Sequence, residues 1–256
     1  MVEHLVANER VTGSNPVTRS NKFFISAPFG NYLQFKNAIS VTGSWTVDPR
    51  PGLFMQIIKT LRLVRSEAGW SWRNKIGLRN AGIHEGIKRR RTFDVLSIAS
   101  IQHWDWINLD SIVNENQSIE VNISCPNLDK HEDASTFPGF DLFPKTKRYW
   151  CICKIPPIAS NDLIDRIVDS GYTQIHASNT LPSDKGGLSG KILVPHTLRI
   201  IEYIKTKYPH VTVIAGGGVT QKWHADYYKN HGADHISLGT VCFTPWKINS
   251  IIKEQT

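Results

Sequence analysis

Long apolar runs are missing from this chain of 256 residues. No stretch approaches the 18 consecutive apolar residues that indicate a transmembrane helix, and the N-terminus lacks the apolar centre of a signal peptide. These absences argue against a membrane-spanning or exported protein. They predict a cytoplasmic one, in which peripheral membrane association is possible but not indicated.

Cysteine is scarce as well, with four in the chain. Cys151 and Cys153 are close in sequence, but on a strand they would lie roughly 7 Å apart, too far for a disulfide. No cysteine and histidine grouping has the spacing of a zinc site, so no metal is expected. The histidines between His131 and His235 are scattered, and most are predicted to lie on the surface. This pattern fits a reducing cytosol.

Acidic residues are outnumbered, 22 against 30 Lys and Arg, which gives a formal charge of +8. The one dense basic run is Lys88-Arg89-Arg90-Arg91. Such a run is usually a solvated loop, although it could also meet an anionic ligand, a membrane surface or RNA.

Short apolar runs recur along the chain from Phe23 onward. Eight of them read as strands: Phe23–Ala27, Ile39–Thr42, Phe93–Ala99, Ile119–Ser124, Trp150–Ile155, Tyr172–Ala177, Val211–Ala215 and His235–Leu238. Apolar residues at helical spacing follow the later runs, at 163–168, 198–204 and 223–228. Strands alternating with helices predict a parallel sheet, and eight of them predict a (β/α)8 (TIM) barrel. About ten residues join the first two strands, too few for a crossover helix, so the barrel should be trimmed in its first half.

Two regions follow from this division. Residues 23–256 would form the barrel domain. Residues 1–22 have no clean period, and Gly13–Val17 resembles the peptide made when a transfer-RNA gene is translated by mistake. We expect an N-terminal arm that is poorly ordered or wrongly assigned and has no role in function.

The stretch Asn122-Ile-Ser-Cys-Pro-Asn127 places two carboxamides, a hydroxyl and a thiol at the end of a predicted strand. Pro126 cannot donate to a β-ladder, so the strand should end before it. Polar side chains at the carboxyl ends of parallel strands are where α/β proteins hold their chemistry. The simpler alternative is a polar turn with one buried cysteine.

Glycines follow the last two predicted strands, as Gly216-Gly217-Gly218 and as Gly239-Thr240. Barrels often bind phosphate between these loops, where the absence of a Cβ lets backbone N–H groups approach the ligand. Gly186-Gly187-Leu188-Ser189-Gly190 looks like a third glycine turn. Tight turns without a ligand are the alternative.

Together these motifs resemble the FMN-dependent dihydroorotate dehydrogenases from about Phe23 to the end of the chain. The resemblance rests on Asn122–Asn127, Lys154 before Pro156-Pro157, Ser178-Asn179-Thr180, Gly186–Lys191, Gly216–Gly218, Gly239-Thr240 and the loop Asn74–Gly82. It implies oxidation of dihydroorotate to orotate in pyrimidine biosynthesis, with FMN as cofactor.

The resemblance also implies roles for individual residues. Cys125 matches the catalytic base, and Lys154 the lysine whose charge stabilises reduced flavin. The residues that match substrate contacts are Asn74, Ile76, Gly77, Leu78, Asn122, Asn127, Asn179 and Thr180. Those that match FMN contacts are Ser44, Asn122, Lys154, Ser178, Gly187, Gly217, Gly218, Gly239 and Thr240.

Departures from the family pattern leave parts of the function open. A lysine present in many members is absent here, and Ser44 would offer a hydroxyl in its place. A cysteine base is typical of soluble members, whereas Gly186–Lys191 is closer to the quinone-using ones, so the acceptor could be fumarate, quinone, or NAD through a partner. A homodimer is possible. The alternatives are an enzyme acting on another dihydropyrimidine or on dihydrouridine in RNA, although nucleic acid is not the expected partner, and an inactive remnant.

Overall fold

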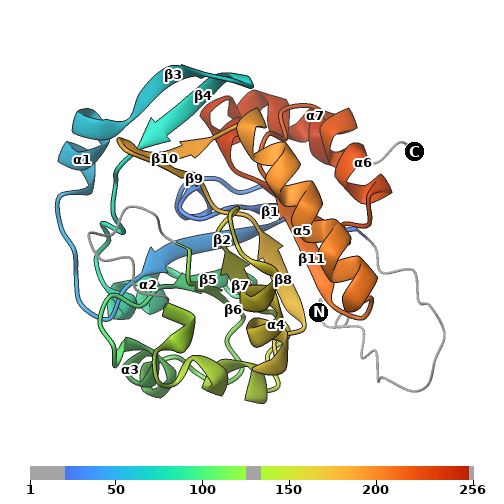
Figure 1. The fold of residues 1–256 in the computed structure, drawn as a ribbon. Helices are drawn as coiled ribbons and strands as arrows, with labels where there is room; N and C mark the ends of the chain where they lie inside the picture. Colours follow the sequence, from blue (N-terminus) through green and yellow to red (C-terminus); the bar gives the residue numbers. More distant parts are fainter. Residues whose placement is uncertain (1–20, 125–133, 254–256) are drawn as a thin grey trace, which may run out of the picture.

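The computed structural model describes residues 21–124 and 134–253, and it contains a closed barrel of eight parallel strands (Figure 1). In order around the barrel these are β1 (Phe23–Ile25), β12 (His235–Leu238), β11 (Thr212–Gly216), β8 (Gln174–Ala177), β7 (Cys151–Ile155), β6 (Ile119–Asn122), β5 (Val95–Ile98) and β2 (Ala38–Trp45). Each strand overlaps one of the eight predicted runs. The predicted barrel is therefore confirmed.

Helices surround this barrel on its outside. They are α2 (Ile83–Arg89), α3 (Asp105–Ile112), α4 (Asn161–Asp169), α5 (Val194–Lys207), α6 (Lys222–Asn230) and α7 (Ile248–Ile252). The three helices predicted from periodicity are α4, α5 and α6. Helix α4 begins after Ser160, whose Oγ accepts a hydrogen bond from the Leu163 N–H at 3.1 Å, and it buries Ile164 and Ile167. This is an N-cap followed by an apolar stripe, which is why this segment is helical.

Two connections in the first half contain no α-helix among the described residues, which agrees with the predicted trimming of the barrel there. Between β1 and β2 the only helical element is the single 3-10 turn Phe29–Asn31. Between β6 and β7 the described residues form 3-10 turns at Ala134–Thr136 and Phe140–Lys145.

A second, four-stranded sheet lies over one end of the barrel in the order β3-β4-β10-β9. Its strands are β3 (Arg62–Ser66), β4 (Gly69–Asn74), β9 (Leu181–Ser183) and β10 (Gly186–Ser189), and α1 (Leu53–Thr60) precedes it. The segment predicted as a third glycine turn is thus mostly strand β10, and that prediction was wrong. A Cβ on Gly186 would lie 2.3 Å from the Asn74 carbonyl oxygen, so the glycine serves close strand approach.

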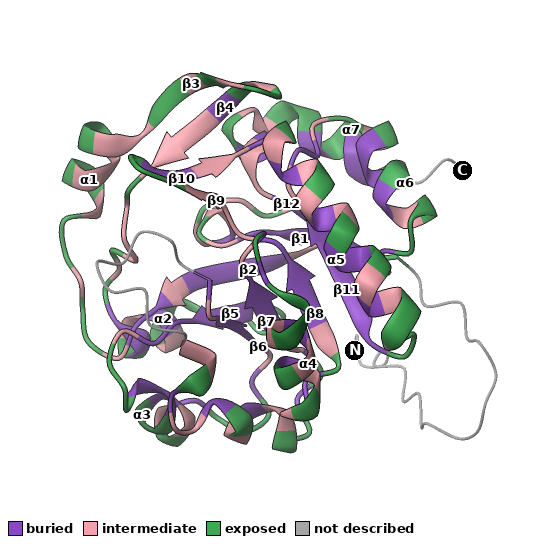
Figure 2. Ribbon diagram, in the orientation of Figure 1, coloured by how far each residue is buried: buried purple, intermediate pink, exposed green. Residues whose placement is uncertain are grey.

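Side chains on the barrel strands alternate between two environments, because successive residues of a strand point to opposite faces. Outward residues such as Leu96, Val121 and Ile175 pack beneath the helices. Figure 2 shows the strands buried accordingly. Inward residues at one end form an apolar floor made of Phe24, Val41, Val95, Trp150, Ile152 and Ile214. The next inward residues toward the carboxyl ends are polar, and they lead into the functional site.

Candidate functional site

A cavity of about 810 Å³ opens at the carboxyl ends of the barrel strands. Its size lies within the range of roughly 300–1,000 Å³ typical of small-molecule sites. The predicted site residues that line it are Ser44, Asn74, Ile76, Leu78, Asn122, Lys154, Ser178, Asn179, Thr180, Gly217, Gly239 and Thr240. The cavity thus gathers residues from both halves of the chain.

Five predicted site residues are not among the lining residues. Gly77 and Gly218 each neighbour a lining residue in sequence, and Gly187 lies on β10 opposite Asn74. Cys125 and Asn127 lie outside the residues that the structure describes.

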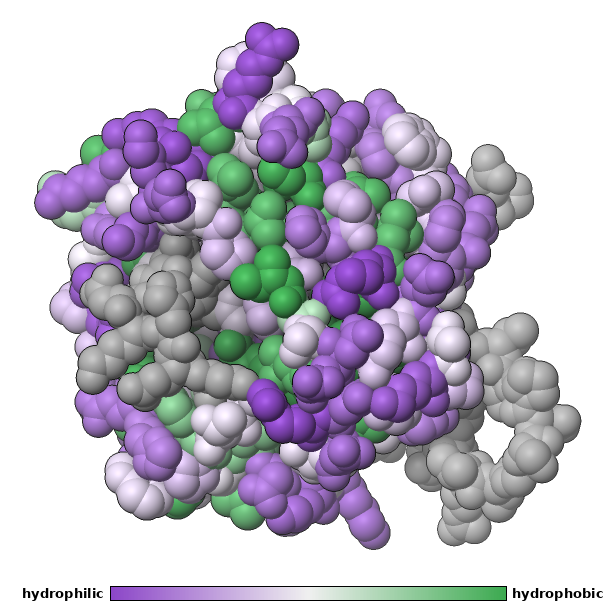
Figure 3. All heavy atoms as spheres, in the orientation of Figure 1, coloured by the Kyte–Doolittle hydropathy of each residue, from purple (hydrophilic) through white to green (hydrophobic). Residues whose placement is uncertain are grey.

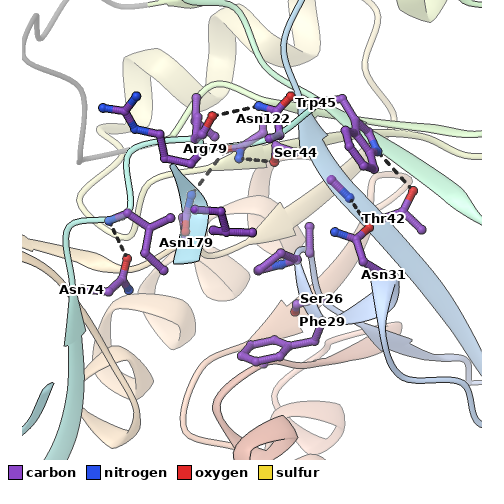
Figure 4. A pocket seen from close by; sticks show the side chains of 18 of the residues that line it. Ser26, Phe29, Asn31, Thr42, Ser44, Trp45, Asn74, Arg79, Asn122 and Asn179 are labelled. Atoms are coloured by element: carbon purple, nitrogen blue, oxygen red, sulfur yellow. Dashed lines mark hydrogen bonds between the residues drawn. The ribbon is translucent and has the colours of Figure 1, made fainter. Parts of the chain in front are cut away.

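A chain of hydrogen bonds joins the amides near the strand ends (Figure 4). Asn122 Nδ2 donates to Ser44 Oγ at 2.8 Å, and Asn122 Oδ1 accepts from Ser124 Oγ at 2.9 Å. Asn179 Nδ2 donates to the same Ser124 Oγ at 3.0 Å. These bonds fix the orientation of the Asn122 and Asn179 side chains, which a planar ligand with several donors and acceptors requires.

The loop after β4, predicted as the substrate loop, is shaped by its own side chains. Asn80 Nδ2 donates to the Leu78 carbonyl at 2.8 Å, and Asn80 Oδ1 accepts from the Gly82 N–H at 2.8 Å. Leu78 adopts a φ of 56°. The Asn80 side chain also accepts a bond from the Thr46 N–H at 3.3 Å, which ties the loop to the residue that follows β2. The loop is therefore held against the barrel mouth.

Lys154 belongs to a buried polar layer inside the barrel. Its Nζ lies 3.8 Å from Glu120 Oε1, and Glu120 Oε2 lies 2.7 Å from His176 Nδ1. Burial by itself would raise the pKa of Glu120, but the charge of Lys154 and the hydrogen bonds of His176 and Ser97 lower this pKa to about 2. Burial lowers the pKa of His176. Glu120 is therefore ionised, and a neutral His176 donates its Nδ1 proton to it.

Glu120 and His176 were not predicted as site residues. The expectation that most histidines lie on the surface was wrong for His176, His224 and His235, which are 2%, 8% and 3% exposed. His176 is buried because it points into the barrel and pairs with Glu120, and His235 packs against Trp150 at 5.4 Å. The sequence did contain a sign of this site, because Glu120 is a charged residue between the apolar residues Ile119 and Val121 of β6.

The glycine loops at the other side of the cavity form a close-packed cradle. Gly217 and Gly218 have φ values of +96° and +73°. A Cβ on Gly217 would lie 2.6 Å from the Leu193 side chain, so a larger residue does not fit there. The loop is anchored by Tyr228, whose hydroxyl donates to the Gly217 carbonyl at 2.7 Å. Together with Lys154 and the amides, this cradle fits a cofactor with a phosphate at one end and a polar ring at the other.

The basic run also reaches this cavity. Lys88 and Arg89 form the last turn of α2, and Arg89, Arg90 and Arg91 line the cavity wall. Arg91 Nε pairs with Asp94 Oδ2 at 2.9 Å. The run is therefore more than a solvated loop, and it adds positive charge to a site that would hold anionic groups.

The family model for dihydroorotate dehydrogenase matches residues 14–256. The chain belongs to the dihydroorotate dehydrogenase family. Among curated relatives, the Dihydroorotate dehydrogenase B (NAD(+)) catalytic subunit of Thermotoga petrophila is 28% identical over 246 residues, which cover 85% of this chain and 88% of that protein. The subunit of the same name from Thermoanaerobacter pseudethanolicus is 26% identical over 263 residues, covering 90% of this chain and 84% of that protein.

A solved structure of ligand-free dihydroorotate dehydrogenase from Eimeria tenella has the same fold. It superposes with a TM-score of 0.62 at 17% identity, and the match covers 83% of this chain and 75% of that one. Membership of the family makes the chain an FMN-dependent oxidoreductase of dihydroorotate in pyrimidine biosynthesis.

Two features are absent from the part of the chain that the structure describes. No helix within it has the length and apolar character needed to cross a membrane. No group of three or more potential metal ligands occurs among the same residues.

Proposed function

We propose that the cavity binds FMN and dihydroorotate side by side and that the reduced flavin passes its electrons to NAD through a partner subunit. The observation that carries the proposal is the convergence on one cavity of Lys154, the amides of Asn122 and Asn179, and the glycine cradle. When bound, FMN supplies the acceptor for the hydride from C6 of dihydroorotate.

The protein side chains have separate tasks in this proposal. The ammonium of Lys154 provides positive charge beside the flavin ring, which favours the anionic reduced form. Asn74, Asn122 and Asn179 orient the pyrimidine with donors and acceptors that add no charge. Cys125, matched through the family motif, removes the proton from C5. Gly217 and Gly239 leave room for the phosphate.

A partner subunit is supported by the names of the curated relatives, which are catalytic subunits of NAD-linked enzymes. The surface of α1 and the β3–β4 hairpin offers a place for such a partner. Its exposed apolar side chains are Phe54 (72%), Met55 (53%), Ile58 (52%), Leu63 (50%) and Trp70 (68%), and Figure 3 shows apolar groups in this region among hydrophilic ones. A patch of this kind indicates an interaction site. A second copy of the chain is the competing occupant.

The direct test is anaerobic reduction of the FMN-loaded protein. Dihydroorotate should bleach the flavin band of the wild type, whereas Cys125→Ala should retain FMN and lose bleaching at neutral pH by 100-fold or more, within the roughly 10²–10⁴-fold range of general base catalysis. Cys151→Ala is the matched control, because burial raises the pKa of this thiol to about 12 and it does not line the cavity. If the wild type binds FMN but dihydroorotate does not bleach it, dihydroorotate is not the substrate.

The acceptor is tested with the protein reduced in this way. NAD⁺ alone should reoxidise it slowly, and fumarate or a soluble quinone should do no better. If fumarate or the quinone reoxidised the flavin as fast as dihydroorotate reduces it, no partner subunit would be needed.

A further inference from the structure

The barrel interior contains a buried carboxylate that the proposed reaction does not use. Glu120 is 1% exposed and lies on β6 two residues before Asn122. Ser97 Oγ donates to its Oε1 at 2.9 Å, and His176 Nδ1 lies 2.7 Å from its Oε2. The carboxylate is thus fully surrounded by donors, as a buried charge requires.

This carboxylate is coupled to the site through two routes. Lys154 Nζ lies 3.8 Å away, which is longer than a direct hydrogen bond, so the ammonium keeps donors for the cavity that it lines. The second route is a relay of hydroxyls, in which Ser44 Oγ lies 2.7 Å from Ser97 Oγ and accepts from Asn122 Nδ2. Because Ser97 donates to Glu120, the relay is polarised from Asn122 toward the carboxylate.

The other inward groups at this level are mostly neutral. His176 is uncharged because burial lowers its pKa, Ser26 and Ser237 bond to each other at 2.6 Å, and β11 contributes Gly216. The charged side chains elsewhere on the cavity wall are Arg50, Arg79, Arg89, Arg90, Arg91 and Asp94. Glu120 and Lys154 are therefore the opposed charges of the inner layer.

We propose that Glu120 is a positioning residue that pairs with Lys154 inside the barrel, offsets part of its charge beside the flavin, and thereby sets the reduction potential of the flavin. The inference rests on the proposed binding of FMN next to Lys154. Removing the carboxylate leaves the ammonium of Lys154 buried without its counter-charge. The full positive charge beside the ring would then favour the anionic reduced flavin more strongly than in the wild type.

The test is the midpoint potential of the flavin measured at neutral pH. Glu120→Gln should show a higher potential than the wild type, because the charge that opposes Lys154 is gone. A potential equal to that of the wild type would mean that Glu120 only fills space.

A double variant shows whether Glu120 acts on the flavin through Lys154 or directly. In a Lys154→Met background, Glu120→Gln should raise the potential less than it does in the wild type, because the charge of Lys154 is the main influence that lowers the pKa of Glu120 and keeps it ionised. The double variant should also be more stable than Glu120→Gln alone, because no charge is left unpaired. An equal rise of the potential without Lys154 would overturn the proposal. If Glu120→Gln fails to fold while the double variant folds, the coupling is supported by that difference.

Asp105→Asn is the matched control. Asp105 is 7% exposed and is the first residue of α3, away from the cavity lining, where its carboxylate accepts from the Ile101 and Gln102 N–H groups of the preceding turn at 2.7 and 2.9 Å. It should lose stability without changing the potential. Failure of the wild type to bind FMN would instead count against the proposed function.

Discussion

At the scale of single residues, the charge of Glu120 links the interior of the barrel to the pH of the solution. Its pKa is about 2 in the folded protein against an ordinary value of 4.5. A carboxyl with a lowered folded-state pKa binds fewer protons in the folded than in the unfolded state. Its contribution to stability is therefore present above pH 4.5 and is lost as the pH falls toward 2.

This yields a prediction for acid unfolding. Between pH 4.5 and 2, the free energy of unfolding of the wild type should fall more steeply than that of Glu120→Gln, whatever their absolute difference at neutral pH. Urea unfolding at half-unit pH steps measures both slopes. Parallel curves would show that Glu120 has the same pKa in both states.

The residue scale is also where prediction from sequence was least complete. Lys154 was assigned a role because it lies in a family motif, and the structure places it on the cavity wall. Glu120 and His176 lie outside the motifs that carry the family resemblance, and their importance depends on three strands placing them in contact. The sequence does not show this pairing, because the two residues are 56 positions apart and come into contact through the folding of the barrel.

At the scale of elements, the loop after β11 depends on glycine for two separate reasons. Gly217 needs a positive φ, and it also needs space beside Leu193. Gly69 in the β3–β4 turn has the same φ of +96°, but a Cβ added there would meet no atom within 4 Å. Substitutions at these two glycines therefore distinguish the effect of backbone strain, which both share, from the effect of steric overlap, which only Gly217 would show.

We predict that Gly69→Ala costs about 1–3 kcal/mol, the usual range for a non-glycine residue in this conformation, and leaves FMN affinity unchanged. Gly217→Ala should cost more than Gly69→Ala and weaken FMN binding at least tenfold, because the loop must move to relieve the contact. Urea unfolding and titration of the apoprotein with FMN measure the two effects. Equal losses in both variants would show that the Leu193 contact has no consequence.

The elements themselves were predicted unequally. The eight barrel strands are short runs rich in apolar residues, so each could be recognised locally. The second sheet was missed because it joins β4 to β10 across more than 100 residues. The reason for glycine at position 186 is visible only when the carbonyl of Asn74 lies close against it. Because Gly186 follows a predicted strand, the sequence suggested a turn there. In the structure this glycine instead allows β10 to pack closely against β4.

At the scale of the whole molecule, the division into an N-terminal arm and a barrel remains a prediction. Residues 1–20 lie outside the described part of the chain, and the family model begins at residue 14. Among the described residues, contact with the barrel begins at Lys22, whose carbonyl accepts from the Ile236 N–H at 3.0 Å.

Removal of residues 1–20 should therefore leave FMN affinity and bleaching by dihydroorotate unchanged within a factor of two. Removal of residues 1–26, which deletes β1, should abolish folding because the barrel can no longer close. Circular dichroism and FMN titration test both truncations. Loss of turnover in the shorter deletion would assign the arm a role.

The apolar floor closes one end of the barrel interior. Phe24, Val41 and Ile214 are each 1% exposed, so among the described residues it is the cavity at the other end that gives water access to the charges of Glu120 and Lys154. Filling the cavity with cofactor and substrate therefore displaces water from this layer. The same pair of charges then acts in a medium of lower dielectric constant, where each interacts more strongly with the ring beside it. Ligand binding thus strengthens the field that these two charges create inside the barrel.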